Sequence, residues 1–148
     1  MKVLLFRTAS DGVINQLLEE LMHIEKISIE GFAQHSAVEK CAKKYPTVKW
    51  IDSGVEIFSE DAGGVELIEN TFYDEIYIPC STQRFTNFEN IFFLLEHLSY
   101  EKVILYDCNG KRKQMKKRNS LAEIIKYMES CLLVSFFTLM YKIKCNMN

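Results

Sequence analysis

Short apolar segments and segments of helical periodicity alternate along the first 110 residues of this 148-residue chain. The apolar runs predict strands at 3–6, 27–33, 48–51, 75–80 and 102–106. Helical spacing predicts helices at 13–22, 35–45, 64–71 and 88–98, and a shorter strand is expected at 55–58. Five strand–helix alternations are typical of an α/β protein. We therefore predict a single Rossmann-like or flavodoxin-like parallel sheet of about five strands, with helices on both faces.

Residues 111–148 differ in character from the rest of the chain. The segment 111–118 is strongly basic, and a helical pattern that begins near 119 becomes almost wholly apolar at 131–141. This apolar stretch is well short of the roughly 20 residues that span a bilayer. We therefore expect a Rossmann-like domain at 1–110, followed at 111–148 by a basic linker and an apolar C-terminal helix.

The net charge of −2 conceals an asymmetry between these two regions. Residues 1–110 hold 9 Lys and Arg against 18 Asp and Glu, whereas residues 111–148 hold 9 against 2. An acidic body argues against nucleic-acid binding, and the basic segment lacks interleaved aromatic residues for base stacking. The segment 111–141 suits an anionic membrane surface, while a solvated linker or docking on a protein stays open. A shifted reading frame in an A+T-rich gene would also produce such an end.

Cysteine usage and the first residues indicate the compartment. Five cysteines are widely spaced without a C-x-x-C pair, which favours free thiols and no metal site. The apolar run at 3–6 is shorter than the roughly 7–15 residues of a secretory signal. These features predict a cytoplasmic protein, with peripheral attachment at the inner face of the membrane if 111–141 binds lipid.

Polar residues follow three of the predicted strands, at the end where open parallel sheets bind ligands. These candidates are Thr8, Ser10, Asp11 and Gly12 after the first strand, Ser81, Thr82, Gln83 and Arg84 after the fourth, and Asp107 and Asn109 after the fifth. A hydroxyl-rich loop at a helix start favours a phosphate, and an arginine adds a bidentate contact. The same residue types also form caps and turns, so both interpretations stay open. The dinucleotide and Walker A motifs are absent, and no cofactor is predicted.

Two further residues have alternative interpretations. Asp52 ends the third strand, where a receiver domain carries its phosphoacceptor, but the acidic pair and the lysine that such a domain also needs are missing. His35 follows the second strand and either lines the crevice or begins a helix. Neither residue alone indicates a reaction.

Several segments together resemble a known family of enzymes. They are MKVLLFR at 1–7, Ser10-Asp11-Gly12, LLEEL at 17–21, Ala33-x-x-Ser36-x-Val38-Glu39, Tyr45-Pro46-x-Val48 and YDEIYI at 73–78. In this order they resemble the amino-terminal half of the heptosyltransferase-like glycosyltransferases of bacterial cell-surface polysaccharide synthesis. The resemblance implies an acceptor-side domain, in which Asp11 is the candidate base for the acceptor hydroxyl.

Two departures from that family bear on function. The family has glycine followed by aspartate in the first loop, whereas Asp11 precedes Gly12 here. The family also uses a second Rossmann-like domain for the nucleotide sugar, so the resemblance implies a partner domain or subunit rather than catalysis by this chain alone. The alternative is a non-catalytic nucleotide-binding or regulatory α/β module that docks to a membrane or a protein through 111–148. Whether the chain is an enzyme therefore stays open.

Overall fold

A computed structural model describes residues 1–59, 62–83 and 89–115, which form an α/β domain with one mixed sheet. Its elements are β1 (Lys2–Phe6), α1 (Asp11–Met22), β2 (Ser28–Ala33), α2 (His35–Lys44), β3 (Lys49–Asp52), the 3-10 helix η1 (Gly63–Leu67), β4 (Phe72–Pro79), α3 (Glu89–Glu96), β5 (Ser99–Tyr106) and β6 (Arg112–Met115). The predicted helix after residue 119 lies outside the described residues.

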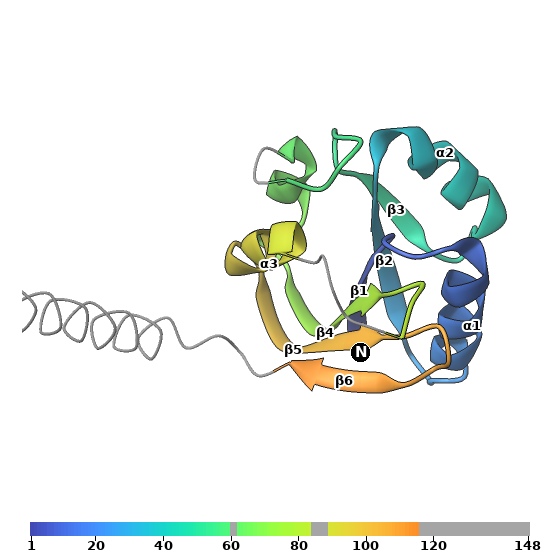
Figure 1. The fold of residues 1–148 in the computed structure, drawn as a ribbon. Helices are drawn as coiled ribbons and strands as arrows, with labels where there is room; N and C mark the ends of the chain where they lie inside the picture. The colour runs from blue at the N-terminus through green and yellow to red at the C-terminus, as the bar shows by residue number, and fades with distance from the viewer. Residues whose placement is uncertain (60–61, 84–88, 116–148) are drawn as a thin grey trace, which may run out of the picture. The chain divides into compact units, whose positions relative to one another are not determined.

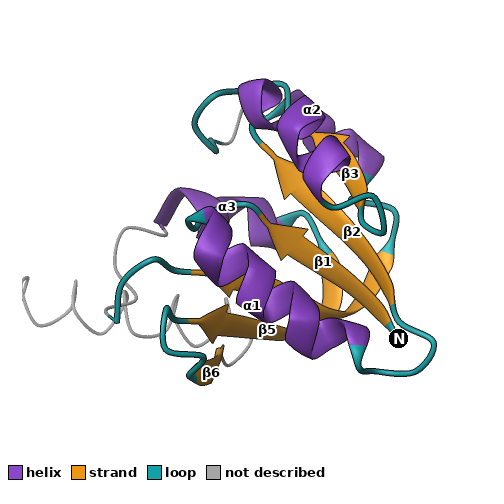
Figure 2. Cartoon of the chain, turned by 90° about the vertical axis from the view of Figure 1, so that its right-hand side faces the viewer, coloured by secondary structure: helices purple, strands orange, loops and turns teal. Residues whose placement is uncertain are grey.

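The six strands are arranged in the order β3-β2-β1-β4-β5-β6 (Figure 2). Neighbouring strands from β3 to β5 are parallel, whereas β6 pairs with β5 in the antiparallel direction. The chain adds strands on one side of β1 and then crosses to its other side at β4. The strand order thus reverses between β1 and β4, and open α/β sheets hold ligands beyond the carboxyl ends of strands at such a reversal.

Both faces of the sheet are covered, which explains the continuous apolar run of β1. Val3 and Leu5 pack in the same core as α1, whereas Leu4 and Phe6 pack in the core on the other face. Strands buried on both faces are apolar throughout, without alternation. Figure 1 shows α1 and α2 on one side of the sheet, and α3 on the opposite side.

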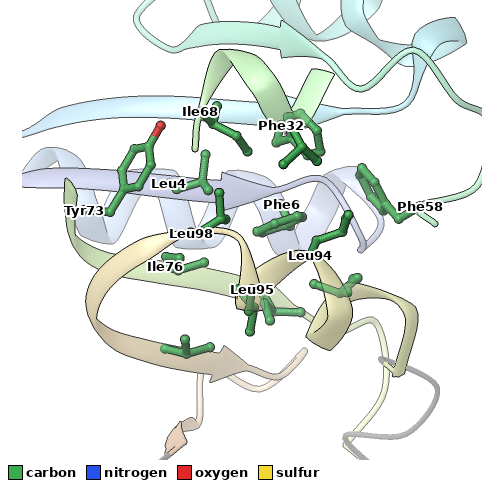
Figure 3. Packing of buried hydrophobic residues seen from close by; sticks show 14 of the residues in the cluster. Leu4, Phe6, Phe32, Phe58, Ile68, Tyr73, Ile76, Leu94, Leu95 and Leu98 are labelled. Carbon is green, nitrogen blue, oxygen red and sulfur yellow. The ribbon is translucent and has the colours of Figure 1, made fainter. Parts of the chain in front are cut away.

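An aromatic cluster lies in the core that the sheet forms with α3 and η1 (Figure 3). The Phe6 ring meets the rings of Phe32 and Phe58 edge-on, with centroids 5.6 and 5.7 Å away, and Phe32 stacks on Phe58 at 5.7 Å. Phe58 is only 5% exposed, although it belongs to no helix or strand. The core is therefore completed by a side chain from the segment that follows β3.

Residues 55–57 form bends and Phe58 has no regular secondary structure, so the expected strand is absent. The apolar pattern reflects inward packing of Val55 and Phe58, whereas Ile57 is exposed. The helix expected at 64–71 is likewise only the 3-10 helix Gly63–Leu67. The start of this 3-10 helix lies directly against the end of β3. Only glycine fits at position 64, because a β-carbon there would stand 2.0 Å from the Asp52 carbonyl oxygen.

Strand β6 adds an antiparallel edge to the sheet, which therefore has six strands and is mixed, where a parallel sheet of about five strands was predicted. The turn before it is closed by Asp107, whose Oδ1 accepts the amides of Asn109 and Lys111, and by Gly110 at φ +76°. Arg112 then pairs with Tyr106 in the ladder. The basic and exposed residues of this strand gave it the sequence pattern of a linker.

Arg112 ties β6 to α1 and its replacement provides a test of this strand. Its guanidinium lies 2.7 Å from Glu20 and over the rings of Tyr77 and Tyr106 at 5.8 and 6.0 Å. We expect Arg112→Ala to lower the free energy of unfolding by about 1–2 kcal/mol, from one partly exposed ion pair and two cation–π contacts. Urea unfolding followed by circular dichroism measures this loss. Lys113→Ala, on the same strand and exposed, is the control and should change stability by less than about 0.5 kcal/mol; equal effects would contradict the role of Arg112.

Candidate functional site

Polar residues from the loops after β1 and β4 meet where the strand order reverses. Thr8 Oγ1 donates to the carbonyl oxygen of Pro79 at 2.5 Å, and the Ser10 amide donates to Ser81 Oγ at 2.8 Å. Each bond joins residues 71 positions apart in the sequence. Thr8, Ser10 and Ser81 therefore lie together, as the rule for neighbouring parallel strands predicts.

Asp11 is the first residue of α1, and its carboxylate lies among three cationic side chains. Oδ1 is 3.2 Å from Arg7 Nη2, while Oδ2 is 2.9 Å from Lys44 Nζ and 3.4 Å from Lys40 Nζ. The hydrogen bond from Lys44 lowers the pKa of Asp11 to about 2, with Lys40 acting in the same direction and burial opposing both. A carboxylate with so low a pKa is a weak base at neutral pH. Its contacts suit a salt bridge between α1 and α2 better than general-base catalysis.

Gly12 leaves the start of α1 open. Within the described residues, no heavy atom lies within 4 Å of the position that a β-carbon would take on Gly12. Ser10 is the N-cap residue and makes no side-chain capping hydrogen bond. The Val13 amide donates to the Ser10 carbonyl oxygen at 3.1 Å, so the amides of Asp11 and Gly12 are the first-turn donors without an intrahelical acceptor, and the helix dipole places partial positive charge there. Solvent or an anion would satisfy these donors.

The remaining predicted contacts do not gather at this point. Thr82 and Gln83 are exposed in the loop after β4, and Arg84 lies outside the described residues. The Asn109 amide donates to Asp107 Oδ1 at 2.8 Å in the turn between β5 and β6. Asn109 therefore serves that turn, and none of the hydrogen bonds in the described ranges joins it to the loop after β1.

A hollow of about 230 Å³ opens beyond the carboxyl ends of β1 and β2. It is lined by Thr8, Gln34, Glu56, Ile57, Phe58, Asn90 and Ile91. Only Thr8 was among the predicted site residues. Gln34 follows β2 as Thr8 follows β1, so the strand-end rule would have included it. The others come from the bends after β3 and from the first turn of α3, where the sequence shows no polar cluster.

His35 and Asp52 are brought together close to this hollow. His35 Nδ1 lies 2.6 Å from Asp52 Oδ2, and this hydrogen bond raises the pKa of His35. The pKa of Asp52 is lowered by the hydrogen bond from the Gly54 amide and, to a smaller extent, by the hydrogen bond with His35. The sequence does not show that these two residues are paired, because α2 and β3 meet only in the folded chain.

In the ranges that the structure describes, no group of three His, Cys, Asp or Glu side chains is placed to hold a metal ion. None of the helices in those ranges combines the length and the hydropathy of a membrane-spanning helix. Cys80 and Cys108 follow the adjacent strands β4 and β5, and Cys80 Sγ lies 3.2 Å from Thr82 Oγ1.

Comparison with known proteins adds no family to this description. No protein-family model matches the chain, and neither a curated protein nor a solved structure matches it significantly.

Proposed function

We propose that this domain binds a small neutral molecule with several hydroxyl groups, such as a sugar, in the hollow beyond β1 and β2. The observation that carries the proposal is the lining of the hollow. Glu56, Gln34, Asn90 and Thr8 supply a carboxylate, two amides and a hydroxyl, beside apolar surface that includes Phe58. A ligand hydroxyl both donates and accepts hydrogen bonds, so it suits this mixture of groups. The apolar surface suits the carbon face of such a ligand.

The charge of Glu56 favours a neutral ligand over a phosphate. Its carboxylate oxygens accept hydrogen bonds from the Ser36 amide and hydroxyl, both of which are neutral donors. The negative charge of Glu56 is therefore not cancelled by these partners. A phosphate in the hollow would meet this charge at short range, whereas a hydroxyl would donate to it.

The same hollow supports an acceptor-side role in glycosyl transfer. The parallel strands follow the order 3-2-1-4-5 of a Rossmann-like sheet, and the sequence resembles the acceptor half of polysaccharide glycosyltransferases. In this proposal the hollow holds the acceptor sugar, and a second domain or subunit supplies the nucleotide sugar. The low pKa of Asp11 weighs against that residue as the base.

A second candidate is a non-catalytic nucleotide-binding or regulatory module. The specific observation in its favour is the start of α1, where open helix amides lie beside Arg7, Lys40 and Lys44. Three cations around the single carboxylate of Asp11 leave a positive excess that favours a phosphate. Docking to an anionic membrane or a protein through 111–148 belongs to this candidate.

Titration of the 15N-labelled full-length chain with a panel of neutral sugars and with a nucleoside diphosphate separates the two candidates. We expect sugars to shift the NMR signals of Thr8, Gln34, Glu56 and Asn90. Glu56→Gln should weaken sugar binding about tenfold, because it removes a hydrogen bond to a charged acceptor.

Glu39→Gln is the matched control, since Glu39 is an exposed carboxylate on α2 that pairs with Lys43. It should bind sugars as the wild type does. Shifts confined to Asp11 and Gly12, caused by the nucleotide alone, would favour the second candidate. Unchanged hollow signals with every sugar would contradict the first.

A further inference from the structure

The segment that follows β3 forms one wall of the hollow, and it is hydrogen-bonded to the first residues of α2. Glu56, Ile57 and Phe58 line the hollow and follow β3 without regular secondary structure. The His35 amide donates to the Val55 carbonyl oxygen at 3.1 Å. The next amide, of Ser36, donates to Glu56 Oε1 at 3.1 Å. The first residues of α2 therefore fix the wall by direct hydrogen bonds.

The Asp52 carboxylate connects the same wall to the imidazole of His35. Its Oδ2 contacts His35 Nδ1 at 2.6 Å, while its Oδ1 accepts the Gly54 amide at 2.7 Å. Gly54 has φ +74°, a conformation that favours glycine and turns the chain into the wall segment. One carboxylate thus holds both the helix start and the turn that begins the wall.

We propose that His35 and Asp52 form a pH-dependent clamp on this wall, closed when the imidazole is protonated and loosened when it loses its proton. The clamp rests on the proposed function only in taking the hollow as the ligand site. His35 is a positioning residue here, because it acts on the hollow through the segment that carries Glu56.

The charged groups facing His35 favour its protonated form. Asp52 comes from β3 and Glu56 from the wall segment, and both are acidic; the hydrogen bond with Asp52 is the larger cause of the raised pKa of His35. A histidine whose pKa is raised in the folded state stabilises that state fully at pH values below its pKa in the unfolded chain, which is about 6.5. That contribution is lost as the pH rises through the folded pKa. The clamp is therefore closed at lower pH and loosens as the pH rises through the raised pKa of His35.

NMR of the full-length chain tests the clamp without any ligand. We expect the amide signals of residues 54–58 to shift with pH together with the His35 ring signals, at a midpoint above about 6.5. His35→Gln keeps a polar side chain without a titrating ring, and should abolish this step. Asp52→Asn should move the midpoint of His35 to lower pH. His23→Gln is the control and should leave the step unchanged, since His23 Nδ1 lies 2.6 Å from the carbonyl oxygen of Glu19 on α1 and not beside the wall.

The result separates the clamp from the proposed function. Wall amides that do not follow the His35 titration in the wild type would overturn the clamp, whatever the hollow binds. A step that persists in His35→Gln would overturn it as well. A pH step at residues 54–58 in a chain that binds no sugar would support the clamp and contradict the proposed function.

Discussion

Replacing Phe58 by alanine is expected to lower the free energy of unfolding by about 3 kcal/mol. The Phe58 ring is 5% exposed and packs against both Phe6 and Phe32. Its removal leaves a cavity that these fixed rings cannot close, because β1 and β2 hold them in the sheet. Calorimetry should show the melting temperature falling by roughly 10 °C.

Ile57→Ala is the matched control for this prediction. Ile57 is the neighbouring residue and lines the same hollow, but its side chain is 74% exposed. Its truncation should change stability by less than about 0.5 kcal/mol. If the two variants were equally stable, Phe58 would not anchor the segment after β3 in the core.

Phe58 also links the core to the candidate site, because it contributes to both. The hollow is bounded on this side by a ring whose position is set by Phe6 and Phe32. The wall is thus fixed at Phe58 by packing and at Glu56 by hydrogen bonds from α2.

The sequence predicted the parts of the fold in which each segment buries its own apolar pattern. The run at 3–6 and the helical spacing after it specify β1 and α1, because burial on both faces of a parallel strand and on one face of a helix leaves different patterns. The position of Thr8 just after β1 also followed from this pattern. These features need no knowledge of distant contacts.

The features that sequence reasoning missed depend on contacts between distant segments. Strand β6 is basic and exposed, so only the partner side chains on α1 and β5 reveal that Arg112 packs. The segment 55–58 shows an apolar pattern that a strand would share, and its bend is imposed by Phe58 reaching the core. Asp11 illustrates the same limit for chemistry. Its lowered pKa comes from Lys40 and Lys44, which lie on α2 about thirty positions later.

Replacing Glu30 by alanine is expected to lower the free energy of unfolding by about 2–3 kcal/mol at neutral pH. Glu30 is 7% exposed and accepts a hydrogen bond from the hydroxyl of Tyr73 at 2.7 Å. Lys49 and Lys2 lie 3.2 and 3.3 Å from the same carboxylate. Alanine would leave the Tyr73 hydroxyl buried without its acceptor. This unsatisfied hydroxyl accounts for most of the expected loss of stability, because both lysines reach solvent and lose little.

The pH dependence of unfolding identifies the charge as the cause. Burial alone would raise the pKa of Glu30, but the hydrogen bonds from Tyr73, Lys49 and Lys2 hold it below its ordinary value. A depressed carboxyl pKa contributes stability that is present above the unfolded value and lost as the pH falls through the folded one. Urea unfolding at several pH values should therefore show the wild type losing stability below about pH 4.5, while Glu30→Gln loses less over the same range.

A double-mutant cycle with Tyr73→Phe separates the buried hydrogen bond from the loss of packing. Glu30→Ala combined with Tyr73→Phe removes both partners, so no buried hydroxyl is left unsatisfied. The double variant should be more stable than the sum of the two single losses predicts, by about 1 kcal/mol or more. Lys49→Ala, whose side chain is 74% exposed, should cost less than about 1 kcal/mol. If Glu30 and Tyr73 stabilise the fold through their hydrogen bond, the cycle must show a coupling energy between the two substitutions. Strict additivity would instead mean that Glu30 stabilises the sheet through its lysines.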